Sequence, residues 1–522
     1  MASIARLNQH VAALLGSTSG LAVGASLGWN SLASQALRSA VGWEAIEADY
    51  VCAALPAAAG LGALCLPGLM WMSPSLSSSQ AIAYVAAPPL AAGWIVVYLA
   101  NYSYPMLLLG RTLTGLGVGV FTIMVPLYTS EISSRRYRYS NLVYFHVMLS
   151  LGIVCSYASS VKVSSLDFDM VPLQLHSVLC MLPSLLAVFC CYVPESHLQR
   201  INVEDSEAVR RLVEREHGDV ADDAEMDREI EKTKKLAKAL QKPQNRLKLL
   251  RDERFWRVFA VVTCVTLCQH LSGSYPVTFN ALTLIDFTGS NQLTSAWLSL
   301  VCATSQLLGT ILALTLVSRL GRRALLTSSA ALMGLALILL GWFIMARETD
   351  PDLNNKYSWM PPTWIGLYFG SYGLGLAPLS SALLADAFPM ELRVPAASAI
   401  GKPTLALIKD TPTCAKPLLL DRHRHNYIPV PCFFANYNSF TLLPSKSSAK
   451  LFAFDTSVAG LGWFLCLALN LQLSTLLMDL GLSGTLWLFA GFCWLGASIA
   501  GIAVRESAGK TLADLQEEFR IS

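Results

Sequence analysis

The residue types that could do chemistry in this sequence lie inside long apolar runs. Arg111 interrupts an apolar run that begins near residue 105 and also holds Gly115, Gly117 and Gly119. A charged side chain is costly in a hydrocarbon layer, so an arginine there indicates a functional role. The glycines would let a neighbouring helix approach closely. The alternative interpretation is a packed membrane helix with no special role.

Signatures of catalysis and metal binding are missing from the sequence. We find no Walker loop, no nucleophile elbow and no metal triad, which argues against an enzyme. Cys264 and Cys268 share one helix face, where small apolar packing explains them better than metal ligation. His423 and His425 lie in a basic tract without partner cysteines. We expect no metal and no cofactor, and the net charge of +3 gives no reason to expect nucleic-acid binding.

Composition and hydropathy predict an all-α membrane protein. The chain has 522 residues, of which 54% are hydrophobic and 14% are charged, and its mean hydropathy is +0.48. A spanning helix needs about 20 apolar residues. Runs that satisfy this requirement lie near 10–30, 50–71, 81–101, 105–128, 141–161, 172–193, 256–280, 296–317, 324–345, 363–386, 457–478 and 485–504.

Basic residues predict the orientation of these spans. Lys and Arg gather in cytosolic loops. If both termini are cytosolic, the outer loops hold only Arg38, Lys162, Arg347 and Lys356. We interpret the N-terminal apolar run as the first helix rather than a removed signal peptide. The chain is therefore expected to be an integral membrane protein, in the plasma membrane, with both termini in the cytosol.

The two halves of the chain repeat a pattern of charges. Glu131 is followed seven residues later by Arg138, and Asp386 is followed seven residues later by Arg393. Each half ends directly after a span, in Pro194-Glu195-Ser196 and Arg505-Glu506-Ser507. Many transporters are built from such repeats and bind their substrate between the halves.

The repeat also exposes an extra segment in the second half. The stretch from Asp386 to Glu506 is 56 residues longer than the stretch from Glu131 to Glu195. The excess falls at Gly401–Thr456, which has no spanning run and begins with Gly-Lys, as a translated splice donor would. We interpret it as a retained intron or an error of gene prediction; the alternative is a genuine cytosolic insertion. The expected division is 1–193 (first six-helix half), 194–255 (cytosolic helical loop, a solvated linker or a gating element), 256–400 (helices 7–10), 401–456 (insertion), 457–504 (helices 11–12) and 505–522 (cytosolic tail).

Several short motifs, in order, resemble the sugar porter family of the major facilitator superfamily. The resemblance covers nearly the whole chain apart from the insertion and is strongest toward insect facilitated trehalose and glucose transporters. It implies twelve helices in two six-helix halves and facilitated transport of a hexose or trehalose by alternating access. The partners implied are a small sugar and the lipid bilayer; the oligomeric state stays open. The motifs are Gly28-Trp29-Asn30-Ser31, Gly110–Arg138, Pro194-Glu195-Ser196, Gln269-His270-Leu271-Ser272-Gly273, Arg319-Leu320-Gly321-Arg322-Arg323, Asp386-Ala387-Phe388-Pro389 and Glu506–Leu512.

The same resemblance implies a sugar site and a cytosolic gate. Amide and imidazole groups would bond hydroxyls and aromatic rings would stack on the sugar, although each side chain could instead bond between helices. Charge pairs at the cytosolic helix ends would bias a two-state equilibrium, or would only set the topology. The substrate-binding residues expected are Asn30, His146, Gln269, His270, Tyr275 and Trp463. The gating residues expected are Arg111, Glu131, Arg138, Glu195, Arg322, Arg323, Asp386, Arg393 and Glu506.

Departures from the family pattern keep a second function open. Ser380 and Ser381 replace a helix-10 Pro-Trp pair, and the loop from Met72 to Gln80 lacks a basic motif. A transporter-like sensor or pseudotransporter that binds without translocating is therefore the alternative. Asn30 is neutral at the place where a proton symporter of the family carries a carboxylate near the helix-4 arginine. This favours facilitated diffusion over proton coupling.

Overall fold

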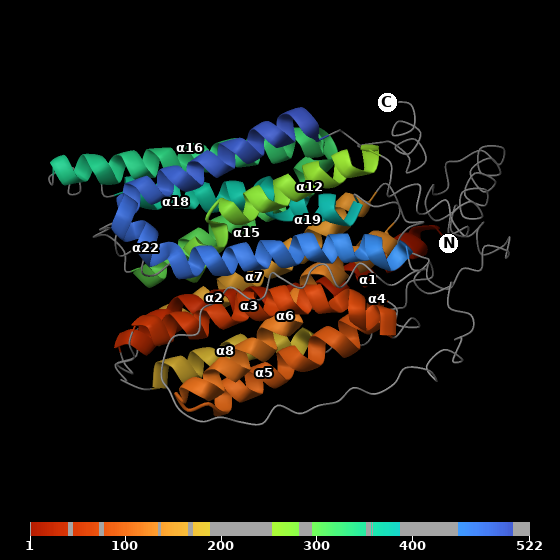
Figure 1. Cartoon of the computed structure of the whole chain (residues 1–522), viewed down its shortest axis with the longest axis horizontal. Coiled ribbons are helices and arrows are strands. Elements are labelled where there is room, and N and C mark those ends of the chain that lie inside the picture. The colour runs from red at the N-terminus through yellow and green to blue at the C-terminus, as the bar shows by residue number, and fades with distance from the viewer. Residues whose placement is uncertain are drawn as a thin grey trace, which may run out of the picture.

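The structure of this chain is a computed structural model. It describes residues 2–39, 45–72, 78–133, 137–164, 171–187, 253–280, 295–350, 357, 359–386 and 447–504. Throughout these ranges the regular secondary structure is helical. The helices run back and forth along the longest axis of the molecule, and the start of α1 and the end of α22 lie at the same end of the bundle (Figure 1). We call this end the termini end and the other the opposite end.

The first half of the bundle contains the N-terminal six spans. Prolines lie in the first turns of α5 and α6, where the missing backbone N–H would have no partner in the helix in any case. A π-helical turn, η1, interrupts the third span. The helices are α1 (Ala2–Ser17), α2 (Ser19–Ser39), α3 (Ala45–Met72), α4 (Ser78–Gln80), η1 (Ala81–Ala86), α5 (Ala87–Leu99), α6 (Tyr104–Ile132), α7 (Arg138–Ser164) and α8 (Val171–Ala187).

The second half repeats this plan with interruptions of its own. Gly321, with φ of 81°, separates α15 from α16, and Gly481, with φ of 70°, turns the chain inside α22 at the opposite end (Figure 1). Both values lie in the left-handed region that favours glycine. The helices are α12 (Glu253–Leu271), α13 (Ser274–Phe279), α15 (Ser295–Leu320), α16 (Arg322–Thr349), α18 (Met360–Ser371), η4 (Tyr372–Leu376), α19 (Ala377–Asp386) and α22 (Ser447–Ala503).

Each of the twelve predicted spans is mainly helical over the residues that the structure describes, and the predicted all-α class with two six-helix halves is confirmed. By length and composition, nine helical segments of the described chain could each cross a membrane. Several boundaries differ from the prediction. Gly481 breaks α22 between spans 11 and 12, inside the gap that the sequence predicted, but α22 begins at Ser447 rather than near residue 457. The part of the predicted insertion before Ser447 lies outside the described residues.

Glycine sets the distance between helices in the first half. A Cβ placed on Gly119 would lie 2.0 Å from the carbonyl oxygen of Ala59 on α3, and one on Gly117 would lie 2.6 Å from that of Ala86 in η1. Real Cβ atoms do not come so close to backbone atoms. The glycines of α6 therefore let α3 and the third span approach from two sides, as the sequence predicted.

Two pairs of long helices join the halves. α7 of the first half packs on α15 of the second, and the Ser150 and Thr310 hydroxyls lie 3.3 Å apart between them. α3 packs on α22, where Gly60 faces the ring of Phe464. The predicted site residues lie between these two contacts, on the helices that line the interface.

Candidate sugar site between the halves

Three aromatic side chains form a cluster in the second half. The His270 ring stacks on Tyr275, with centroids 5.3 Å apart and planes 26° apart. Tyr275 in turn lies 5.3 Å from the Trp463 ring of α22. The chain brings His270 and Tyr275 together by breaking helix 7 at Gly273, whose φ of 82° requires glycine. The cluster offers aromatic faces to a bound molecule.

Trp463 and His270 fit together only because α22 has a glycine beside the imidazole. A Cβ at Gly462 would lie 2.5 Å from the His270 ring. The imidazole is fixed on its other side, since its Nδ1 lies 2.8 Å from the Thr266 carbonyl oxygen one turn earlier on α12. Nε2 is thus the nitrogen that remains for a ligand.

The Gln269 amide lies beside this cluster and is held by helix 10, which consists of α18, η4 and α19. Its nitrogen donates to the Tyr372 hydroxyl at 3.2 Å, and its oxygen accepts from the Ser380 hydroxyl at 2.5 Å. An amide has two donors and an acceptor oxygen with two lone pairs. One donor and one lone pair of Gln269 therefore remain for another partner.

Two hydrogen bonds tie the first half to the same place. His146 Nε2 of α7 lies 2.9 Å from the Ser381 hydroxyl of α19. Trp463 Nε1 reaches the Thr122 hydroxyl of α6 at 3.4 Å. Since Ser380 and Ser381 are adjacent, His146 and Gln269 approach one short segment of helix 10 from opposite halves. The structure therefore brings five of the six predicted binding residues together: His146, Gln269, His270, Tyr275 and Trp463.

The site is closed in this structure. The exposed fractions of His146, Gln269, His270 and Trp463 are 7%, 5%, 6% and 3%. Contacts between the halves lie on both sides of the site. At the opposite end the Tyr157 hydroxyl donates to the Thr278 carbonyl oxygen at 2.6 Å. At the termini end the Arg322 guanidinium lies 4.0 Å from the centroid of the Tyr139 ring. Any molecule that binds between the halves must separate one of these contacts.

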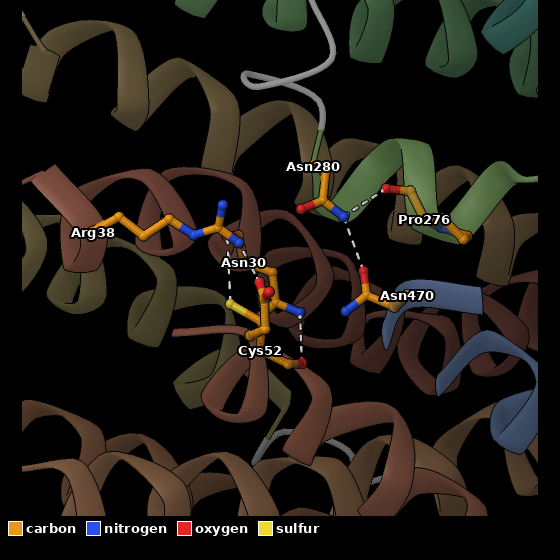
Figure 2. Close-up of polar contacts among 7 residues, drawn as sticks. Asn30, Arg38, Cys52, Pro276, Asn280 and Asn470 are labelled. Carbon is orange, nitrogen blue, oxygen red and sulfur yellow. Dashed lines mark hydrogen bonds and ion pairs between the residues drawn. The ribbon is translucent and has the colours of Figure 1, made fainter. Parts of the chain in front are cut away.

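Asn30, the sixth predicted binding residue, lies apart from the cluster, inside the first half. Its oxygen accepts a 2.6 Å hydrogen bond from Arg111 Nη2, and its nitrogen donates to the Cys52 carbonyl oxygen at 3.2 Å (Figure 2). Both ends of the amide are thus engaged by protein. A role of Asn30 in binding a sugar remains a prediction.

Arg111 is fully buried and only partly bonded. Beyond the bond to Asn30, its Nη2 donates to the Ser26 carbonyl oxygen at 2.9 Å, and its guanidinium lies 4.5 Å from the Trp29 ring centroid. Nε and Nη1 have no hydrogen-bond partner within the described chain. Within the described residues no carboxylate forms an ion pair with Arg111.

Polar contacts at the opposite end were not predicted. The Asn280 amide at the end of α13 donates to Asn470 of α22 at 2.9 Å and to the Pro276 carbonyl oxygen at 3.1 Å (Figure 2). Arg38 of α2 forms an ion pair with Asp49 of α3.

The predicted gating residues are placed only in part. The Ser78 hydroxyl donates to Glu131 at 2.6 Å, and Arg323 donates to the Gly501 carbonyl oxygen. Arg138 and Arg322 are buried at the starts of α7 and α16. Asp386 is the last residue of α19. Outside the described residues lie Glu195, Arg393 and Glu506.

Within the described residues, no group of three His, Cys, Asp or Glu side chains could hold a metal ion. The chemistry that this interface offers is therefore hydrogen bonding by amide and imidazole groups beside aromatic faces. That combination suits a neutral polyhydroxyl molecule, which has hydroxyls on its edge and C–H groups on its faces.

Comparison with known proteins agrees with this chemistry. The profile of the sugar (and other) transporter family matches residues 52–403. The sugar transporter ERD6 of Arabidopsis thaliana is 27% identical over 317 residues, which are 59% of each chain. The facilitated trehalose transporter Tret1-2 homolog of Drosophila simulans is 21% identical over 444 residues, covering 85% of this chain and 77% of that one. The chain thus matches less than two thirds of the Arabidopsis relative's length.

Solved structures show the fold. The major facilitator proton:xylose symporter XylE bound to 6-bromo-6-deoxy-D-glucose superposes with a TM-score of 0.67 at 15% identity, over 99% of this chain and 100% of that one. XylE from E. coli in its inward open conformation gives a TM-score of 0.59 at 15% identity, over 98% of both chains. The twelve helices therefore adopt the major facilitator fold, as the sequence predicted.

Proposed function

Because this chain belongs to the sugar transporter family of the major facilitator superfamily, we propose that it carries a hexose or trehalose across a membrane by alternating access. Family and fold are those of transporters, not of enzymes. One observation carries the proposal. The Gln269 amide and the His270 imidazole lie beside Tyr275 and Trp463 at the interface of the two halves; Gln269, His270 and Trp463 are buried, and Tyr275 is partly buried.

Alternating access requires contacts that open in turn. The Tyr157–Thr278 bond lies at the opposite end, and the Arg322–Tyr139 contact lies at the termini end. Each joins one half to the other, so opening either end breaks the contact at that end and preserves the other. The closed arrangement corresponds to the state in which a substrate is sealed from both sides.

We propose that transport is facilitated diffusion without proton coupling. Proton coupling needs a group between the halves or near Arg111 that gains and loses a charge. The side chain that bonds Arg111 is the neutral amide of Asn30, and within the described residues no carboxylate forms an ion pair with this guanidinium. His146 and His270 are the titratable groups that remain beside the site.

Uptake into proteoliposomes tests the proposal directly. Radiolabelled trehalose and hexoses should equilibrate across the membrane in a saturable way. A proton ionophore should leave the initial rate and the final level unchanged. Collapse of concentrative uptake on adding the ionophore would contradict facilitated diffusion.

Gln269→Ala tests the placement of the site. Removing one partner of a buried hydrogen bond leaves the other unpaired, at about 1–3 kcal/mol. Sugar binding should weaken about 5- to 150-fold, since 1.4 kcal/mol is tenfold. Asn141→Ala is the matched control, because this amide is also buried but bonds Ser133 inside the first half. Equal apparent affinities of wild type and Gln269→Ala would show that the site lies elsewhere.

The second candidate function is a sensor or pseudotransporter that binds sugar without moving it. Ser380 and Ser381 favour this candidate, because they stand where the family pattern has Pro-Trp and both are engaged in hydrogen bonds of the closed state. Saturable sugar binding to purified protein, with no accumulation in proteoliposomes, would select it over transport.

We also propose a plasma-membrane location with both termini in the cytosol. The basis is the small number of basic residues in the predicted outer loops. In Figure 1 the start of α1 and the end of α22 lie at the termini end, so a single orientation places both on one side. Epitope tags at both termini should be stained only in permeabilised cells; staining of intact cells would reverse the orientation.

A further inference from the structure

Helix 10 contains a π-helical turn next to the Gln269 amide. In η4 the Ala377 N–H donates to the Tyr372 carbonyl oxygen, five residues back, instead of four as in an α-helix. Such a turn adds one residue to a helix and is frequent at functional sites. Two groups that bond Gln269 lie on either side of the turn: Tyr372 begins it and Ser380 follows it on α19.

The extra residue explains why both hydroxyls reach the same amide. Residues in an α-helix are rotated by about 100° each, so positions eight apart would differ by about 80° in direction. One inserted residue reduces the difference to that of seven α-helical steps, about 20°. Tyr372 and Ser380 therefore share one face of helix 10 because of η4, and this face meets Gln269.

We infer that Tyr372 and Ser380 are positioning residues of the sugar site, which hold the Gln269 amide in a single orientation. In this structure the Ser380 hydroxyl donates to the amide oxygen and the Tyr372 oxygen accepts from the amide nitrogen, so both ends of the amide are engaged by helix 10. What remains is one N–H and one lone pair on neighbouring atoms. A ligand with two adjacent hydroxyls, one accepting and one donating, matches this pair.

This inference rests on the proposed function but makes a separate claim. The claim is that helix 10 acts on a sugar through Gln269 and not by touching it. An amide held from both ends discriminates between a vicinal diol and an analogue that lacks one hydroxyl. With the analogue bound, one of the two free groups of the amide, the N–H or the lone pair, is left without a partner. An amide released from one end can rotate and lose this discrimination.

Tyr372→Phe and Ser380→Ala each remove one hydroxyl and test the inference. Each should weaken hexose binding about fivefold, the equivalent of one hydrogen bond of about 1 kcal/mol. Each should also reduce the ratio of affinities for the hexose and its monodeoxy analogues. Tyr368→Phe is the matched control. Tyr368 is equally buried on the same helix, but its hydroxyl bonds the Ser272 carbonyl oxygen, so the ratio should stay unchanged.

The double variants with Gln269→Ala decide the mechanism. If Tyr372 and Ser380 act through the amide, neither substitution should weaken binding further in the Gln269→Ala background. A further fivefold loss there would overturn the inference, because the hydroxyls would then act on the sugar directly.

Melting temperatures of the sugar-free protein give a readout that does not depend on transport or binding. The effects of Ser380→Ala and Gln269→Ala should be non-additive, since both remove the same bond. If Gln269→Ala leaves sugar binding intact, the proposed sugar site is wrong. The melting temperatures of the single and double variants then still test whether Ser380 holds the Gln269 amide. Additive effects on melting would overturn the inference, whatever the substrate.

Discussion

Replacing Tyr157 with phenylalanine should open the molecule at the opposite end. The Tyr157 hydroxyl is the donor of a 2.6 Å hydrogen bond to the Thr278 carbonyl oxygen, and this bond links α7 of the first half to α13 of the second. Tyr157 exposes 2% of its surface. In Tyr157→Phe the closed state keeps a buried carbonyl without a donor, whereas water can reach that carbonyl when this end is open.

The magnitude follows from the loss of that donor. A buried acceptor left without a partner is destabilising by about 1–3 kcal/mol, which corresponds to a shift of about 5- to 150-fold toward the state open at the opposite end. Cys466 reports this shift. It is fully buried on α22, one turn beyond Trp463, and adjoins Tyr275. Its rate of modification by a membrane-impermeant thiol reagent, applied from the opposite end and read by mass spectrometry, should rise by the same factor.

The control for this experiment is Tyr368→Phe. Tyr368 exposes 2% of its surface and also donates to a backbone carbonyl oxygen, at 3.1 Å, but its partner Ser272 belongs to the same half. This variant should lose stability without a change in Cys466 modification. If both variants accelerate Cys466 modification equally, or neither does, the Tyr157 hydrogen bond does not hold the two halves together.

Three further results are expected. Asn30→Ala should lower the stability of the protein by about 1.5–3 kcal/mol, because Arg111 loses a charge-assisted hydrogen bond. Asn280→Ala breaks a neutral, half-buried hydrogen bond and should lower the stability by about 1 kcal/mol or less. Equal losses of stability in thermal melts of the two variants would contradict this. Gly462→Ala should weaken sugar binding by displacing the His270 ring, and Gly491→Ala on the same helix, with no atom within 4 Å of the added Cβ, should leave binding unchanged. If 401–456 is a retained intron, sequenced transcripts should join residue 400 directly to 457, near the end of the family match at 403; a dominant transcript that contains the segment would rule this out.

The fold was predictable because apolar length alone identifies a spanning helix. Each predicted run became helix, since backbone groups in a bilayer have no partners other than each other. Helix ends were less predictable. The break at Gly481 falls in the predicted gap between spans 11 and 12. The start of α22 at Ser447, in contrast, falls in a stretch without a spanning run, so hydropathy contains no information about it.

The site was predictable where its residues are close in sequence. Gln269, His270 and Tyr275 surround a single helix break, so one motif contains them all. Partners from helix 10 were missed for a geometric reason. By regular periodicity Tyr372 and Ser380 would face different directions, and only the π-helical turn aligns them. The Asn280–Asn470 bond joins residues 190 positions apart, a pairing that depends on tertiary packing.

The contacts that join the two halves share one property, which is that few of them involve a formal charge. The hydrogen bonds that tie the halves together at His146, Ser150, Tyr157 and Trp463 run between neutral groups. Arg111 is bonded wholly within its own half and travels with it. A charge that crosses a membrane potential of 100 mV gains or loses about 2.3 kcal/mol. If the chain carries a neutral sugar between such surfaces, as we propose, almost no charge moves with it, so voltage should neither drive nor oppose its passage and the sugar concentration gradient alone would set the direction of flow.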